Sequence, residues 1–207
     1  MRRSLFLILF IVLACSPAGR AEILGVGGGL AAYPLDLRGL KEELAGQGAP
    51  AEGLARIPDF LPLPHLGLRG RLGLLGPLAV QLEAAHLGLE LPLAEELSLS
   101  LGSTVISISL LGRFEALFIG LVLGIGTDLI QGELALSSSD PGTEALLEQL
   151  GLGSLPWSAA TVHGLGEVEL VLGPLRFYLE GRYLYPLSQS GLGIGIWEAG
   201  LGLMIVI

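Results

Sequence analysis

The chain has 207 residues, of which 51% are hydrophobic and 15% are charged, with a formal net charge of -9 and a mean hydropathy of +0.70. Soluble surfaces usually need roughly 25–35% charged side chains, so the composition excludes an ordinary water-soluble exterior. A helical membrane protein needs runs of about 20 apolar residues, and the sequence has none after its first 20 residues. The acidic balance excludes nucleic acid as a partner, because phosphate binding requires basic patches.

The first 21 residues predict a signal peptide, which leaves residues 22–207 as a single domain. Met1-Arg2-Arg3 is a basic start, Leu5–Ala14 is an apolar stretch of signal-peptide length, and Gly19-Arg20-Ala21 is an acceptable cleavage site. The alternative is a lipoprotein leader with an acylated Cys15, although Leu13 departs from the small residue usual in that motif. Because Cys15 is the only cysteine, no intramolecular disulfide is possible.

Three tight-turn motifs divide the rest of the chain into hairpins. They are Leu74–Leu78, Leu110–Phe114 and Val171–Leu175, each flanked by segments of alternating character. Tight turns marked by Gly-Pro between period-two segments are typical of β-hairpins. Leucine-rich segments also have helical propensity, but the 32 glycines would each cost about 1 kcal/mol in a helix and therefore favour strands.

The sequence predicts an all-β fold, an eight-stranded antiparallel up-and-down transmembrane β-barrel preceded by a signal peptide. The expected strands are Ile23–Tyr33, Leu66–Leu75, Leu78–Leu89, Ser98–Leu111, Ala116–Leu129, Ala160–Leu172, Leu175–Tyr185 and Ile194–Ile207. Each is near the ~9–11 tilted residues of a membrane strand, and short turns alternate with long polar loops. Two loops contain expected short helices, Leu37–Gln47 and Thr143–Leu150. Within Ser98–Leu111 the alternation changes phase around Gly102-Ser103, which indicates a bulge or part of a loop.

One face of the expected strands is aliphatic, and the other combines glycine with scattered charge. Between Leu66 and Leu74, leucines alternate with Gly67, Arg69 and Arg71. A lipocalin-like soluble barrel would place leucine inward, but a face of glycine and few charges suits a narrow lumen better than a water-facing surface. We therefore expect an interior network of paired charges. Its expected members are Arg69, Arg71, Glu83, Glu167, Glu169, Arg176, Glu180, Arg182 and Glu198.

This charge network has two interpretations, a structural plug and a gated pore or proton path, and its nearly balanced charge favours the plug. Aromatic residues near strand ends predict an interfacial girdle, because membrane barrels carry such girdles at both boundaries. The expected girdle residues beside the long loops are Tyr33, Trp157, Tyr183, Tyr185 and Trp197.

In this topology, Glu22–Ile207 resembles the small eight-stranded outer-membrane proteins, the class that contains the OmpA transmembrane domain and OmpX. The resemblance rests on topology rather than on a shared motif. It implies a location in the bacterial outer membrane, contact with membrane lipid and insertion by the barrel-assembly machinery, and we expect a monomer. The last strand of that family normally ends in Phe or Trp, whereas this chain ends Leu203-Met204-Ile205-Val206-Ile207.

The sequence predicts no enzymatic chemistry. His163 lies a few residues from Ser158, and His65 and His86 lie at other strand ends, but no acidic residue is obviously arranged to orient them. There is no zinc-type Cys/His spacing and no phosphate-cradling loop, so we expect neither a metal nor a cofactor. Gly25–Gly29 lacks the helix of a dinucleotide motif and is interpreted as lumen clearance.

The predicted function is that of a non-enzymatic outer-membrane protein with a plugged polar lumen and a structural or surface-interaction role. The alternatives are a narrow channel or small-solute transporter, and a periplasmic or lipid-anchored lipocalin-like binding barrel. The acidic loop residues are interpreted as solvated, with capture of divalent cations or of a basic partner as the alternative.

Overall fold

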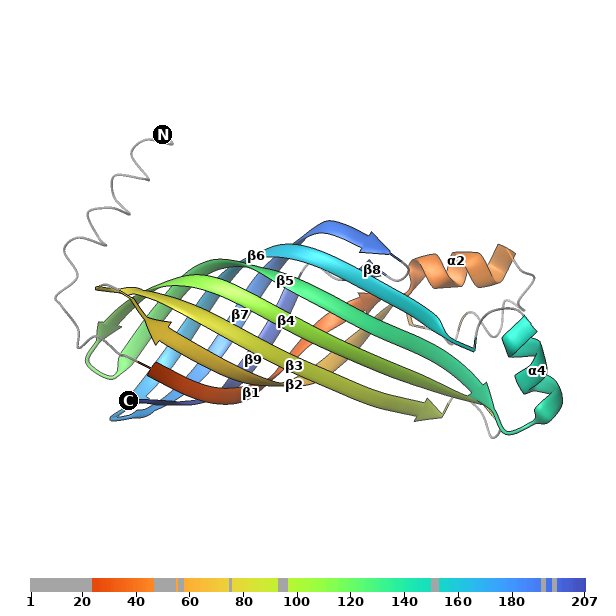
Figure 1. Ribbon diagram of the computed structural model, residues 1–207, viewed down its shortest axis with the longest axis horizontal. Coiled ribbons are helices and arrows are strands. Elements are labelled where there is room, and N and C mark those ends of the chain that lie inside the picture. The colour runs from red at the N-terminus through yellow and green to blue at the C-terminus, as the bar shows by residue number, and fades with distance from the viewer. Residues whose placement is uncertain are drawn as a thin grey trace.

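A computed structural model describes residues 24–46, 55, 58–74, 76–92, 97–149, 153–190, 193–194 and 197–207. Within these residues one antiparallel sheet closes on itself into a barrel (Figure 1). The predicted signal peptide, residues 1–21 with Cys15, lies outside the described residues. Among the residues described, no helix is long and apolar enough to cross a bilayer.

The barrel strands follow one another around the ring in chain order. They are β1 (Leu24–Asp36), β2 (Phe60–Gly73), β3 (Leu78–Pro92), β4 (Leu97–Ala116), β5 (Ile119–Ser138), β6 (Leu155–Leu172), β7 (Leu175–Ser190), β8 (Gly193–Ile194) and β9 (Trp197–Val206). β9 pairs with β7 and β1, and the short β8 also pairs with β1, so β8 and β9 share the eighth position of the ring. This arrangement confirms the predicted eight-stranded up-and-down barrel.

The two ends of the barrel differ in their connections. Short turns join β2 to β3, β4 to β5 and β6 to β7 at one end, called here the inner end, where Ile207 also lies (Figure 1). The opposite, outer end carries α2 (Arg38–Gly46) and α4 (Pro141–Gln149). Both helices confirm the two short helices predicted in the loops, with shifts of one or two residues at their ends.

Helix α4 begins with a capping residue at the end of β5. The Asp140 carboxylate accepts hydrogen bonds from the backbone N–H and the hydroxyl of Thr143, each at 2.8 Å, and Pro141 occupies the first helical position. These hydrogen bonds hold the pKa of Asp140 below its usual value. The cap explains why the helix starts two residues before the predicted Thr143.

The outer wall of the barrel is an aliphatic belt toward the inner end and polar toward the outer end. The exposed belt residues are Leu24, Val26, Leu30, Leu66, Leu68, Leu72, Leu82, Ile106, Ile108, Leu110, Ile119, Leu121, Leu123, Ile125, Leu129, Val162, Val168, Leu170, Leu179, Leu201, Leu203 and Ile205. Farther along the same strands the outward residues include Glu90, Ser100, Thr104, Gln131, Glu133 and Ser158. Soluble monomers rarely expose an apolar surface of this extent, so the belt requires an apolar environment.

The interior makes the opposite change of polarity. Its inner half is mostly charged and also holds a small apolar cluster of Ala79, Leu111, Val122 and Leu165. Its outer half is a larger buried apolar cluster made of Tyr33, Leu35, Leu37, Leu63, Ala85, Leu87, Leu101, Val105, Ile130, Leu134, Trp157 and Ala159. The girdle prediction is therefore wrong for Tyr33 and Trp157, which are 1% and 3% exposed and point inward. Both lie beyond the belt, at a height where the interior rather than the exterior is apolar.

This exchange of polarity also explains the phase change in the sequence of β4. Leu101, Ser103 and Val105 all point inward, and β4 pairs with β3 and β5 through this region without a register shift. The expectation of a bulge or loop at Gly102-Ser103 is therefore wrong. The hydrophobic pattern changes phase because the apolar environment moves from the outside of the wall to the inside, while the backbone alternation continues.

The turn between β4 and β5 lies farther along the chain than the predicted Leu110–Phe114. Both strands continue to a two-residue turn at Leu117-Phe118, where Leu117 has a φ of 60°. The β6–β7 turn falls where predicted and uses Gly173 with a φ of 66°, a conformation that glycine adopts at no steric cost. Gly112-Arg113 lacks the proline of that turn, and the longer hairpin brings Arg113 within ion-pair distance of Glu169.

Candidate functional site

Charged side chains fill the inner half of the barrel interior. All nine residues predicted for the network point inward and are more than nine-tenths buried. Because side chains alternate along a strand, Arg69 and Arg71 on β2 face the interior together, as do Glu167 and Glu169 on β6. Buried charges of this kind require partners, since desolvation penalises each of them strongly.

Arg69 is the centre of the charge network. Its Nη1 lies 2.7 Å from Glu167 Oε2, and its Nη2 lies 2.8 Å from Glu180 Oε2 and 3.0 Å from Glu83 Oε2. The guanidinium carbon also lies 4.1 Å from the centroid of the Tyr178 ring, a cation–π distance. One arginine thus joins carboxylates from β3, β6 and β7 across the lumen.

Three further arginines extend the network toward the inner end. Arg71 Nη1 lies 2.5 Å from Glu169 Oε1, and the other oxygen of Glu169 lies 2.8 Å from Arg113 Nε. Arg113 also pairs with Glu115 at 2.5 Å, and Arg176 lies 3.5 Å from the same Glu115 oxygen. Arg113 and Glu115 were not predicted as members, because the expected turn placed them outside the strand.

Arg182 extends the network toward the outer end. Its Nε lies 2.7 Å from Glu180, and its Nη1 lies 3.6 Å from Glu198 and 3.9 Å from Asp128. Glu198 also lies 3.6 Å from Nε2 of the buried His65. The ion pairs therefore run without interruption from Glu115 near the inner mouth to Glu198, which lies beside His65 beneath the outer apolar cluster.

Glycines on the inner face make room for the large side chains of the lumen. Tyr178 lies against Gly29 on β1 and Gly202 on β9, where a Cβ atom would collide with the tyrosine hydroxyl. Trp157 lies against Gly132 in the same way. The geometry agrees with the interpretation that inward glycines provide clearance, and the space they leave is filled by side chains.

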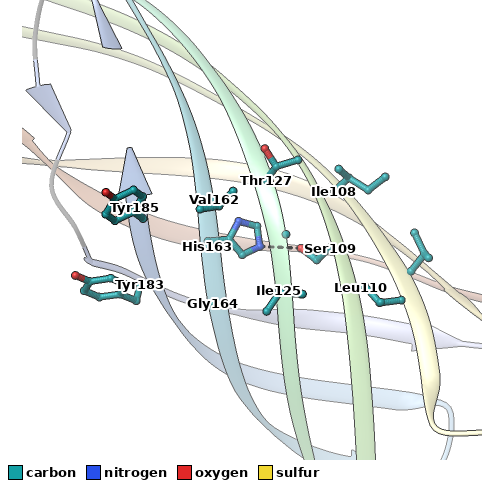
Figure 2. A pocket seen from close by; sticks show the side chains of 12 residues that line it. Ile108, Ser109, Leu110, Ile125, Thr127, Val162, His163, Gly164, Tyr183 and Tyr185 are labelled. Carbon is teal, nitrogen blue, oxygen red and sulfur yellow. Dashed lines mark hydrogen bonds between the residues drawn. The ribbon is translucent and has the colours of Figure 1, made fainter. Parts of the chain in front are cut away.

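A hydrogen-bonded relay of Ser109, His163 and Asp128 adjoins the charge network. Asp128 Oδ2 accepts from His163 Nδ1 at 2.8 Å. His163 Nε2 lies 2.9 Å from Ser109 Oγ, as Figure 2 shows. Thr161 donates a second bond to the same carboxylate oxygen at 2.6 Å. Gly126 lies between Ser109 and His163 in the strand register, so no side chain obstructs the histidine.

The relay corrects the expectation that no acidic residue orients His163. Asp128 does so from β5, whereas Ser158, the serine considered from the sequence, points outward. The distances are those of an activated nucleophile. However, Ser109 is 2% exposed and the His163 side chain has no exposed surface, so both groups are buried.

The remaining candidate groups are dispersed. His86 points outward, where its Nδ1 lies 3.1 Å from Thr104 Oγ1. In the part of the chain that the structure describes, no group of His, Cys, Asp or Glu side chains is arranged to hold a metal ion. Of the acidic loop residues, Asp140 and Glu144 bond to the backbone around α4, and Glu52, Glu95 and Glu96 lie outside the described residues.

Comparisons with known proteins find similarity in structure only. No protein-family model matches the chain, and no curated protein matches it by sequence. Among solved structures, Ail, the attachment invasion locus protein of Yersinia pestis, is 10% identical over 88% of this chain and 97% of its own, with a TM-score of 0.52. Neisserial surface protein A is 11% identical over 89% of this chain and 97% of its own, also with a TM-score of 0.52.

The chain has the fold of the small outer-membrane β-barrels. At 10–11% identity, the similarity establishes architecture and not activity. Ail has also been solved with the heparin analogue sucrose octasulfate, and that structure matches with the same TM-score of 0.52.

Proposed function

We propose that this chain is an integral protein of a bacterial outer membrane, with a lumen closed by its charge network and a structural or surface-interaction role. The exchange of polarity along the strands is the observation that carries this proposal. Aliphatic side chains cover the outer wall where the interior is charged, and polar side chains cover it where the interior is apolar. This pattern fits a barrel whose inner half is surrounded by lipid and whose outer half is surrounded by water. A lipocalin-like soluble barrel would instead require leucine to point into the interior along its whole length.

The proposal of a closed lumen is supported by burial at every level of the interior. Arg69, Arg71 and Arg182 are each 3% exposed or less, and they are held by carboxylates from opposite sides of the ring. Above them the apolar cluster, which includes Leu35 and Leu134, is equally closed. An eight-stranded barrel is just wide enough for its side chains to fill it.

Fractionation and conductance test the two parts of this proposal separately. The chain is expected to remain in the membrane after carbonate or urea extraction and to shift in gel mobility on boiling. In planar bilayers the wild-type barrel is expected to give no steady single-channel steps. Arg69→Ala, which removes the central guanidinium, is expected to give steps, while Arg38→Ala on the exposed helix α2 serves as a matched control. Release by extraction would overturn the membrane location, and steady wild-type steps would overturn the plug.

The proposal excludes hydrolase activity at the relay. A fluorophosphonate probe is expected to leave Ser109 unmodified in the folded barrel, because the residue is only 2% exposed. Mass spectrometry of the digested protein would detect the adduct. Labelling of Ser109 that disappears in His163→Ala, with the gel shift of the folded barrel retained, would refute a purely structural relay.

We further propose that the barrel is monomeric and is inserted by the barrel-assembly machinery. β9 closes the ring by pairing with β1, so in the described part of the barrel its long strands leave no sheet edge open to a second chain. Light scattering in detergent is expected to give the mass of one chain. Depletion of the assembly machinery is expected to abolish the heat-shifted band, despite the aliphatic C-terminus.

A further inference from the structure

A groove of about 610 Å³ lies in the outer wall of the barrel, within the aliphatic belt, and its lining residues come from β3, β4, β5, β6 and β7. Figure 2 shows Tyr183 and Tyr185 on one side of it and Ile108 and Leu110 on the other. All four of these side chains are exposed on the outward face of their strands, so the groove opens to the outside. Ser109 and His163 of the relay also line the groove, although they alternate with the outward residues of their strands and are themselves buried.

Gly164 on β6 keeps the groove open. It is paired in register between Ile125 and Tyr183, whose outward side chains form the two walls. A Cβ atom at Gly164 would meet no atom within 4 Å, and the same holds for Gly166 and Gly181 next to it. Unlike the inner-face glycines, these are not required by packing within the chain. Their effect is to leave space for something outside it.

The dimensions of the groove favour a small ligand over a second copy of the chain. Its volume is within the ~300–1,000 Å³ of small-molecule sites. It is lined by 12 residues, whereas a stable protein interface uses about 20–30 residues on each side. Because the belt lies in lipid if the proposed function holds, the available small ligand is a lipid chain, and this inference rests on that function.

The rim of the groove indicates the class of lipid. Tyr183 packs edge-on against Trp197 at 4.8 Å between ring centroids. The pair lies at the boundary of the belt that faces the outer end, beyond Leu179 on β7 and Leu201 on β9. Tyrosine and tryptophan at such a boundary place an apolar ring in the hydrocarbon and a polar group among lipid headgroups. No lysine or arginine lines the groove among the described residues, so nothing there favours an anionic headgroup.

We propose that the groove binds one acyl chain of a zwitterionic phospholipid, with the headgroup beside Tyr183 and Tyr185. The floor at Gly164 admits the chain against the backbone, and the aliphatic walls bury its methylene groups. A side chain placed on the floor fills the space that the acyl chain needs, without disturbing the lumen.

Native mass spectrometry of the whole barrel, purified in mild detergent, tests this proposal. The probe is palmitoyl-oleoyl phosphatidylethanolamine, with the matching phosphatidylglycerol titrated in parallel. Gly164→Leu fills the floor, and Gly70→Leu is the matched control, because Gly70 faces outward in the belt and its Cβ position is also open. Wild type and Gly70→Leu are expected to bind one ethanolamine lipid, and Gly164→Leu to bind it at least tenfold more weakly.

Three results would overturn the proposal. They are equal lipid binding by Gly164→Leu, binding of phosphatidylglycerol as tight as that of phosphatidylethanolamine, and a dimer peak that Gly164→Leu abolishes. The gel shift on boiling is measured on every variant. If Gly164→Leu stays in the membrane, keeps its gel shift and binds lipid as the wild type does, only the groove proposal is refuted. If the wild type itself does not integrate into the membrane, the proposed function is refuted.

Discussion

Replacing Arg69 with methionine measures how much the charge network stabilises the barrel. Methionine keeps much of the side-chain volume and removes the charge that Glu83, Glu167 and Glu180 share. Removing one member of a buried ion pair typically costs about 3–5 kcal/mol, because the partner charge stays buried. The three carboxylates keep other cations, Glu167 through Arg71 and the other two through Arg182, so we expect a loss near 3 kcal/mol.

Urea unfolding in lipid vesicles, followed by the gel shift of the folded form, gives this free energy. Arg38→Met is the control, because Arg38 pairs with Asp36 at 2.5 Å but its side chain is 60% exposed. Exposed pairs contribute little to stability, because solvent screens the two charges. Adding Glu167→Gln to Arg69→Met removes a carboxylate that has lost one of its two arginines, so the double variant is expected to lose about 1–3 kcal/mol less than the sum of the single losses. Equal small losses at Arg69 and Arg38, with no coupling, would refute this account of the lumen.

Three further predictions test separate features of the barrel, each by the same unfolding assay. Ile108→Arg within the belt is expected to cost about 2–4 kcal/mol and Ser100→Arg beyond it about 0–1, so equal costs would contradict the assigned belt. Leu117→Gly relieves a φ of 60° and is expected to stabilise by about 0.5–1 kcal/mol; a loss would mean that the turn is unstrained. Gly126→Ala places a Cβ in collision with the backbone oxygen of Ile108 and 2.6 Å from His163 Nε2, so we expect a loss of about 1–3 kcal/mol from both contacts; no loss would contradict the close packing of Gly126 against the relay.

The inward set of charges was predictable because strand alternation alone determines which residues share a face. Arg69 and Arg71 lie two positions apart on one strand, so the backbone places them on the same side whatever the register. The partners depend on barrel closure, which the sequence does not specify. Glu167, which pairs with Arg69, is 98 residues away and on a strand that is not adjacent to β2.

The relay was not predictable for a related reason. Asp128 and His163 lie 35 residues apart, and they meet only because β5 and β6 pair in a register that places Gly126 opposite His163. Ser158, which lies near His163 in the sequence, is on the opposite face of the wall. The sequence alone does not show that Gly126 makes room for the His163 ring, because this depends on the register of β5 and β6.

The two misplaced aromatic residues and the phase change in β4 have one physical cause. Hydrophobic periodicity identifies the apolar face of a strand on the assumption that its surroundings are uniform along its length. Here the outward apolar run of β5 extends from Ile119 to Leu129, and the next apolar residues, Ile130 and Leu134, point inward. A run of about 11 residues, rising ~3.3 Å each at a tilt of ~40°, covers about 28 Å along the barrel axis. That height is close to the ~25 Å apolar band of membrane barrels. Beyond this height the wall of the barrel is surrounded by water instead of lipid. The apolar side chains of the strand, such as Ile130 and Leu134, therefore point into the lumen, where they are removed from water.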